Sequence, residues 1–169
     1  RYPEAEAYLT EGLVLAKEFN LAEIAADILL ALGTSAYYQG KADRAKIYFQ
    51  EGLDVAREAN YQRAIVVFLD NLALADFREG HLDQAKTRYL EALALAREIE
   101  DLQSESHLLQ VLGALEVRRG DLNAADEYLL KGLSIARKLE FKERISALLA
   151  NLGGVAGTRG DSAGAIAYM

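Results

Sequence analysis

The chain repeats itself every forty residues over most of its 169-residue length. Each period ends in a glycine, and these are Gly40, Gly80, Gly120 and Gly160. Small and apolar residues recur in the same columns, as in Ala45, Ala85 and Ala125 or Leu32, Leu72, Leu112 and Leu152. A fixed period of this size is typical of stacked repeats, in which each unit buries its apolar face against the next. The sequence therefore predicts a single array over 1–169, with periods at 1–40, 41–80, 81–120 and 121–160 and a truncated start of a fifth.

Two helices fit into each period. Apolar residues recur at spacings of three and four, as in Leu21, Ile24, Ala25 and Ile28, which places them on one helical stripe. Glycine or asparagine follows several of these stripes, where a left-handed residue ends a helix. The predicted helices are 2–19, 21–39, 42–59, 61–79, 82–99, 101–119, 122–139 and 141–159, with a stub from 162. Loops of two or three residues make neighbouring helices antiparallel.

Composition narrows the classes of function. The net charge is −7 and the sequence pI is about 4.9, which argues against direct nucleic-acid binding. The chain has no cysteine and hence neither a disulfide framework nor a zinc knuckle, and it shows no secretory leader or membrane-length apolar run. We therefore expect a cytoplasmic protein without cofactors that does not engage a membrane. The chain begins at Arg1 inside a period, so we expect it to be a fragment of a longer protein.

These columns resemble the tetratricopeptide repeat (TPR) family. Leucine and glycine in the first helix are followed by a turn glycine, an alanine, an aromatic residue and a small residue, which here are Leu32, Gly33, Gly40, Ala45, Phe49 and Gly52. The longer forty-residue variety is similar to the sensor arm of maltose-regulator-type transcription factors and related signal-transduction ATPases, and to Pins-type scaffolds. The resemblance implies an all-α fold, a right-handed α-solenoid of antiparallel helix pairs.

The resemblance also implies a concave groove lined by the first helix of each repeat unit, where a unit is counted as the helix pair from Leu21 to Ala59 and its equivalents. Its predicted polar and aromatic residues are Asp27, Tyr37, Tyr38, Asp70, Asn71, Phe77, Arg78, His107, Gln110, Arg118 and Asn151. Arg78 and Arg118 beside the aromatic residues suit a peptide with an acidic group and an apolar anchor. The alternative is a solvated face in which these arginines pair with Glu79 and Glu116. Of the carboxylate clamp that some family members use, only Asn71 is present, so binding of chaperone tails is not expected.

Other chemistry finds little support in the sequence. His81 and His107 have no partner at metal-ligand spacing, and no acid, base and nucleophile converge at a recognisable spacing, so we expect no metal site and no enzyme. Both ends of the array expose apolar residues, which are Tyr8, Leu9 and Leu13 at one end and Ile166, Tyr168 and Met169 at the other. These ends predict end-to-end self-association.

The sequence leaves two functions open. The first is a protein-interaction or scaffold module that binds a peptide or a partner domain in its concave groove. The alternative is a ligand-sensing arm that regulates an attached signal-transduction ATPase or a transcriptional regulator.

Overall fold

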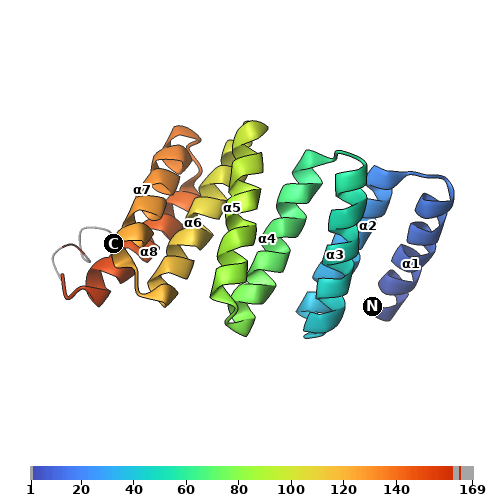
Figure 1. Ribbon diagram of the computed structural model, residues 1–169, viewed down its shortest axis with the longest axis horizontal. Coiled ribbons are helices and arrows are strands. Elements are labelled where there is room, and N and C mark those ends of the chain that lie inside the picture. The colour runs from blue at the N-terminus through green and yellow to red at the C-terminus, as the bar shows by residue number, and fades with distance from the viewer. Residues whose placement is uncertain (1, 162–163, 165–169) are drawn as a thin grey trace. The chain divides into compact units, whose positions relative to one another are not determined.

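The computed structural model describes residues 2–161 and 164, and it divides into two compact units, 1–80 and 81–169. Unit 1 contains four helices and unit 2 contains four more among the described residues (Figure 1). Their bounds are α1 Tyr2–Glu18, α2 Ala22–Tyr38, α3 Ala42–Glu58 and α4 Gln62–Glu79, then α5 Leu82–Glu98, α6 Leu102–Arg119, α7 Leu122–Lys138 and α8 Lys142–Thr158. The predicted helix bounds are confirmed to within one residue. The stub predicted from 162, including Ile166, Tyr168 and Met169, lies outside the described residues apart from Gly164.

Within each unit, consecutive helices form antiparallel pairs. In unit 1, α2 packs against α1 and α3 and also contacts α4; in unit 2, α6 packs against α5 and α7 and also contacts α8. The first helices of successive repeat units, counted from Leu21, therefore lie side by side, α2 with α4 and α6 with α8. The all-α fold of antiparallel helix pairs is confirmed, whereas the continuous array over 1–169 stays a prediction. Among the described residues, no helix is long and apolar enough to cross a membrane.

Left-handed residues end the helices. All four period-ending glycines have positive φ, between 74° and 86°, and Asn20 and Asn60 adopt the same conformation, as the sequence predicted. At the first such turn, the Gly40 amide donates to the Tyr37 carbonyl oxygen at 2.9 Å and the Lys41 amide donates to the Ala36 carbonyl oxygen at 2.9 Å. This pair of bonds satisfies carbonyl groups that the end of the helix leaves open.

Two further turns place a glutamate in the left-handed conformation, which the sequence pattern did not predict. Glu100 and Glu140 have φ values of 56° and 53°, in the same place after the second helix that Asn20 and Asn60 occupy. A side chain with a Cβ is strained in this conformation by roughly 1–2 kcal/mol. The stacking of the flanking helices therefore imposes the turn on residues that disfavour it.

Small residues allow the helices to approach closely. Gly33 on α2 lies so near the Phe49 ring on α3 that an added Cβ would clash with it. Unit 2 repeats this contact with smaller groups, because a Cβ on Gly113 would lie 2.6 Å from Leu129 Cγ. Around Leu129, one core cluster of unit 2 comprises Ala125, Leu133, Ala136, Leu148, Leu152 and Val155.

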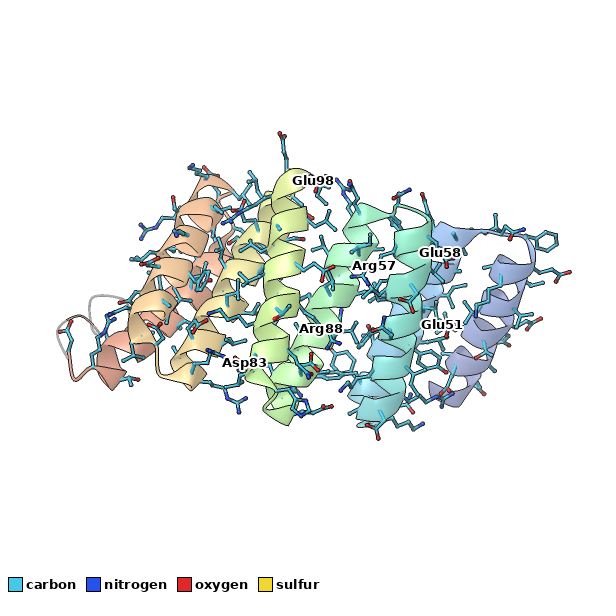
Figure 2. All side chains as sticks on the ribbon, viewed as in Figure 1. Glu51, Arg57, Glu58, Asp83, Arg88 and Glu98 are labelled. Atoms are coloured by element: carbon cyan, nitrogen blue, oxygen red, sulfur yellow. The ribbon has the colours of Figure 1, made fainter. Side chains whose placement is uncertain are left out.

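Ion pairs fix the register between helices. In unit 2, Lys86 on α5 pairs with the buried Glu116 on α6 at 2.7 Å, and Arg119 pairs with Asp83. Figure 2 labels Asp83 near the first turn of α5 and Glu98 near its last. The start of α5 is therefore tied to the end of α6, as an antiparallel pair requires.

Replacing Glu100 with glycine should stabilise the protein. Glu100→Gly removes the left-handed strain and should raise the free energy of unfolding by about 1 kcal/mol. Glu91→Gly is the matched control, because Glu91 is an exposed residue in the middle of α5; glycine there should lower the free energy by about 1 kcal/mol. Urea unfolding of both variants checks the expected opposite signs, and equal signs would contradict this account of the turn.

Truncating a core leucine should destabilise unit 2. Leu112 is fully buried, so Leu112→Ala should lower the free energy of unfolding by about 2–5 kcal/mol through lost burial and a residual cavity. Leu130→Ala makes the same change at a side chain that is 48% exposed, and it should cost about 1 kcal/mol or less. Thermal unfolding that ranks the two variants equally would refute the stacked core.

Candidate functional site

The predicted groove residues fall on two helix pairs, one in each unit. We call them the α2/α4 face and the α6/α8 face. The α2/α4 face carries Asp27, Tyr37, Tyr38, Asp70, Asn71, Phe77 and Arg78. The α6/α8 face carries His107, Gln110, Arg118 and Asn151.

On the α2/α4 face, Arg78 and two tyrosines come together. The Arg78 guanidinium carbon lies 4.9 Å from the centre of the Tyr37 ring, which is a cation–π contact between α4 and α2. The rings of Tyr37 and Tyr38 meet edge to face, with centroids 5.8 Å apart and an interplanar angle of 77°. Tyr38 is 76% exposed, so this cluster presents an aromatic surface beside a positive charge.

The carboxylate proposed as an alternative partner of Arg78 is engaged elsewhere. Glu79 accepts from Lys46 on α3 at 2.9 Å, so it helps to join α3 and α4. Arg78 packs on Tyr37 instead. Arg78 therefore lies against an aromatic ring on the α2/α4 face, and Glu79 pairs with Lys46.

The remaining residues of the α2/α4 face are more dispersed. Asn71 is half-buried, and its amide nitrogen donates to the Val67 carbonyl oxygen at 2.8 Å, one turn earlier in α4. Its amide oxygen is the acceptor that this side chain can offer to a ligand. Asp27 is exposed near the start of α2, while Asp70 and Phe77 are half-buried on α4.

On the α6/α8 face, Arg144 joins two predicted residues that lie on α6. Its Nη1 donates to Gln110 Oε1 at 2.8 Å and lies 2.8 Å from His107 Nδ1. Its guanidinium carbon also lies 5.6 Å from the centre of the Phe141 ring. Arginine can only donate, so His107 Nδ1 is the acceptor in this contact. We call His107, Gln110 and Arg144 the polar cluster.

Sequence reasoning missed Arg144. The signal was present in its column, because the equivalent residues of the other periods are Ile24, Ala64 and Ser104. An arginine that replaces small or apolar residues at one repeat breaks the pattern. The predicted groove positions begin one turn later on each of these helices, so they do not include the column of Arg144.

A cavity of about 290 Å³ lies on the same face, further along α6 and α8. Ala114 and Val117 line the cavity from α6, and Asn151 on α8 contributes an amide side chain to its wall. Its other lining residues are Leu129, Ala150, Gly154, Val155 and Thr158. Asn151, a predicted groove residue, therefore lies at a mainly apolar hollow, whereas Arg118 is exposed near the end of α6.

Small residues in unit 2 account for this hollow. Val117 and Thr158 stand eighty residues after Tyr37 and Arg78, which stack on each other in unit 1. The Thr158 hydroxyl donates to the Gly154 carbonyl oxygen at 2.9 Å and so remains close to its own helix. The same columns thus hold an aromatic–cation stack in unit 1 and border a cavity in unit 2.

Comparisons with known proteins establish the fold. No protein-family model matches the chain, and no curated protein matches it. Among solved structures it is similar to BtubC from P. vanneervenii, with a TM-score of 0.90 and 22% identity over 99% of this chain and 70% of that one. A signal transduction ATPase with a tetratricopeptide repeat sensor, from Pyrococcus horikoshii, matches with a TM-score of 0.82 and 17% identity over 96% of this chain and 25% of that one.

A third neighbour is a Rap protein complexed with Competence and Sporulation Factor. It has a TM-score of 0.77 and 15% identity, over 97% of this chain and 52% of that one. At these identities the likeness concerns the fold alone. The chain has the fold of TPR-like repeat proteins, as its sequence columns predicted.

Removing the Tyr37 hydroxyl should not harm folding. This oxygen is buried and has no hydrogen-bond partner among the described residues. Tyr37→Phe keeps the ring under Arg78 and removes an unsatisfied polar atom, so the free energy of unfolding should stay equal or rise by about 1 kcal/mol. Tyr38→Phe is the control on the exposed neighbour and should change it by less than about 0.5 kcal/mol. A clear loss of stability in Tyr37→Phe would show that the hydroxyl has a structural partner.

Proposed function

We propose that this chain is a protein-interaction module that binds a peptide or an extended segment of a partner protein on the α2/α4 face and the α6/α8 face. The observation that carries the proposal is the α6/α8 face, where the polar cluster and the apolar cavity lie on one side of the same two helices. Directional polar groups beside an apolar hollow suit a ligand with both kinds of side chain.

The α2/α4 face adds a second contact surface of similar chemistry. Arg78 over Tyr37, with the exposed Tyr38 beside it, offers a cation and aromatic edges to an acidic or apolar side chain. Tyrosine and arginine are enriched where proteins bind one another. The Rap neighbour supports the proposal, because that protein, with the same fold, is complexed with a factor.

A ligand-sensing arm is the second candidate. It is supported by the neighbour from Pyrococcus horikoshii, in which a tetratricopeptide repeat array is the sensor of a signal transduction ATPase. The cavity is at the lower limit of the roughly 300–1,000 Å³ typical of sites for drug-sized ligands, so a single side chain suits it better. We propose a non-catalytic role in either case, in keeping with repeat arrays that present binding surfaces.

Self-association is a further part of the proposal. Tyr8 and Leu15 on α1 and Phe19, which directly follows α1, are exposed by 75%, 48% and 65%, and spacings of seven and eleven residues from Tyr8 place all three on one stripe. Leu13, which the sequence placed among the exposed residues of the open end, is buried instead. A second copy would cover this stripe, and light scattering across a wide concentration range would detect the association.

Selection of peptides tests the proposed function. A library of random dodecapeptides displayed on phage would be selected on the intact chain, and Kd values of the enriched peptides measured by fluorescence anisotropy. Two variants remove groove side chains, Asn71→Ala/Arg78→Ala on one face and Gln110→Ala/Asn151→Ala on the other. At least one should weaken binding about tenfold or more.

A control triple variant changes exposed residues of α3 and α7 instead, Gln50→Ala/Lys131→Ala/Lys138→Ala. It should bind as wild type does. Circular dichroism would first confirm that all variants are equally folded. Peptides that bind both groove variants normally, or a selection that yields no binding peptide, would refute binding on the α2/α4 and α6/α8 faces.

A further inference from the structure

We infer that the exposed side of α1 is a docking surface for a basic amphipathic helix of a partner protein. We call this surface the α1 face, and it consists of Glu4, Tyr8, Glu11 and Leu15 on α1 together with Phe19, which directly follows α1. This surface is separate from the α2/α4 and α6/α8 faces. Its occupant is a helix that lies along α1.

The residues of the α1 face share one side of the helix. Spacings of four, seven, eleven and fifteen residues from Glu4 place them together, and all of them are exposed. The buried residues of α1, Leu13 and Ala16, lie on another side, where α1 packs against α2. Among the described residues, neither Glu4 nor Glu11 has an ion-pair partner. The α1 face therefore combines uncovered apolar groups with two carboxylates.

Helix α3 shows how a helix docks at these columns. Forty residues after Glu4, Tyr8, Glu11 and Leu15, α3 holds Arg44, Tyr48, Glu51 and Val55. Arg44 pairs with Glu6 of α1. Glu51, which Figure 2 labels, pairs with Lys17 of α1. These columns of α3 thus receive the neighbouring helix α1, and α1 presents the same columns to solvent.

The apolar residues of these columns are covered on α3 and uncovered on α1. Tyr48 and Val55 are half-buried, and Val55 lines a hollow together with Ala16 of α1. Tyr8 and Leu15, in the same two columns, are exposed by 75% and 48%. A helix docked on α1 in the way that α1 docks beside α3 would bury this apolar surface, which is favourable.

The charges of the α1 face call for a basic partner. On α3, the Arg44 guanidinium carbon lies 5.5 Å from the centre of the Tyr48 ring, and the same guanidinium pairs with Glu6. In the column of Arg44, α1 carries Glu4 instead, so it supplies no cation beside Tyr8. An arginine of the partner can fill this place, pairing with Glu4 and lying over the Tyr8 ring.

The docking of α1 beside α3 also sets the spacing within the partner helix. Glu6 and Lys17, which reach α3, are eleven residues apart, and eleven residues make about three turns on one stripe. A helix placed in the same way brings one basic residue to Glu4 and a second, eleven residues later, to Glu11. Its residues four and seven positions after the first basic residue lie on the same stripe and should be apolar.

A second copy of the chain suits the α1 face less well. In the column of Glu6, where the partner helix needs a cation, α7 carries Asp126. Either carboxylate would meet Glu4, and like charges at close range disfavour the pairing. The net charge of −7 adds a long-range attraction for a basic helix. The self-association proposed above uses the same stripe, and a basic helix should displace the second copy.

Binding of a designed helix tests the inference. The probe is a fluorescein-labelled, hydrocarbon-stapled alanine helix with two arginines eleven positions apart and leucines four and seven positions after the first arginine. It should bind the intact chain, and the same helix with glutamate at both arginine positions should bind about tenfold more weakly or worse in fluorescence anisotropy. Failure of the arginine helix to bind, or equal binding of the two helices, would overturn the inference.

Charge reversal on α1 should invert this preference. Glu4→Arg/Glu11→Arg should bind the glutamate helix about tenfold or more tightly than the arginine helix. Glu98→Arg/Glu127→Arg makes the same change of net charge at exposed residues of α5 and α7, and it should keep the wild-type preference. Circular dichroism would confirm that the variants are equally folded. A preference that Glu4→Arg/Glu11→Arg leaves unchanged would contradict docking on α1.

The apolar part of the α1 face is tested without a change of charge. Tyr8→Ser/Leu15→Ser should weaken binding of the arginine helix about tenfold or more through lost burial. Ile47→Ser/Leu90→Ser changes exposed apolar residues of α3 and α5 and should leave the Kd unchanged. Self-association that depends on Tyr8 and Leu15 and survives saturation with the arginine helix would assign the face to a second copy and overturn the inference.

The variants of the other two faces separate this docking surface from the proposed function. Asn71→Ala/Arg78→Ala and Gln110→Ala/Asn151→Ala should bind the arginine helix as wild type does. A loss in either variant would place the helix on the α2/α4 or the α6/α8 face, which would refute docking on α1 and leave the proposed function standing.

Discussion

The close approach of α2 to α3, and of α6 to α7, determines the rest of the structure. Where Gly33 meets Phe49, and where Gly113 meets Leu129, the side chain of the second helix packs directly against the backbone of the first. A Cβ on either glycine would have to displace its partner or push the helices apart. This spacing brings α2 beside α4 and α6 beside α8. It thereby decides which sequence columns are buried in the core and which lie on the exposed α2/α4 and α6/α8 faces.

Once the core columns are fixed, the surface columns are free to differ between units. Tyr37 and Arg78 fill theirs with a stacked pair, whereas Val117 and Thr158 border a hollow eighty residues later. This difference between the units leaves the core unchanged, because none of these four side chains belongs to the buried core. A repeat protein can therefore change what it binds by substituting a few residues on an unchanged backbone.

The helices and most turns could be predicted because their signals are local and repeated. Periodic leucines and a glycine or asparagine at each end specify a helix without reference to its neighbours. Glu100 and Glu140 escaped prediction because the strain they carry is imposed by stacking, which a local pattern does not contain. The same holds for Arg144, whose meaning depends on Gln110 and His107 from another helix. Column positions predicted which residues share a face, but only the packed side chains revealed which of them touch.

Three features that packing does not explain lie on the α2/α4 face and the α6/α8 face. The Tyr37 hydroxyl is buried without a partner among the described residues, Gly154 weakens a helix that would accept alanine, and Arg144 holds a charge on a half-buried site. Each lowers stability relative to a simple alternative, such as phenylalanine, alanine or an uncharged residue. Sequences that are otherwise consistent with their fold depart from it mainly where function requires. The core columns of this chain follow the rules of packing closely, and the departures face the same surfaces on which charge, aromatic edges and a cavity are found. These departures are the observations that support the proposal of binding on the α2/α4 face and the α6/α8 face.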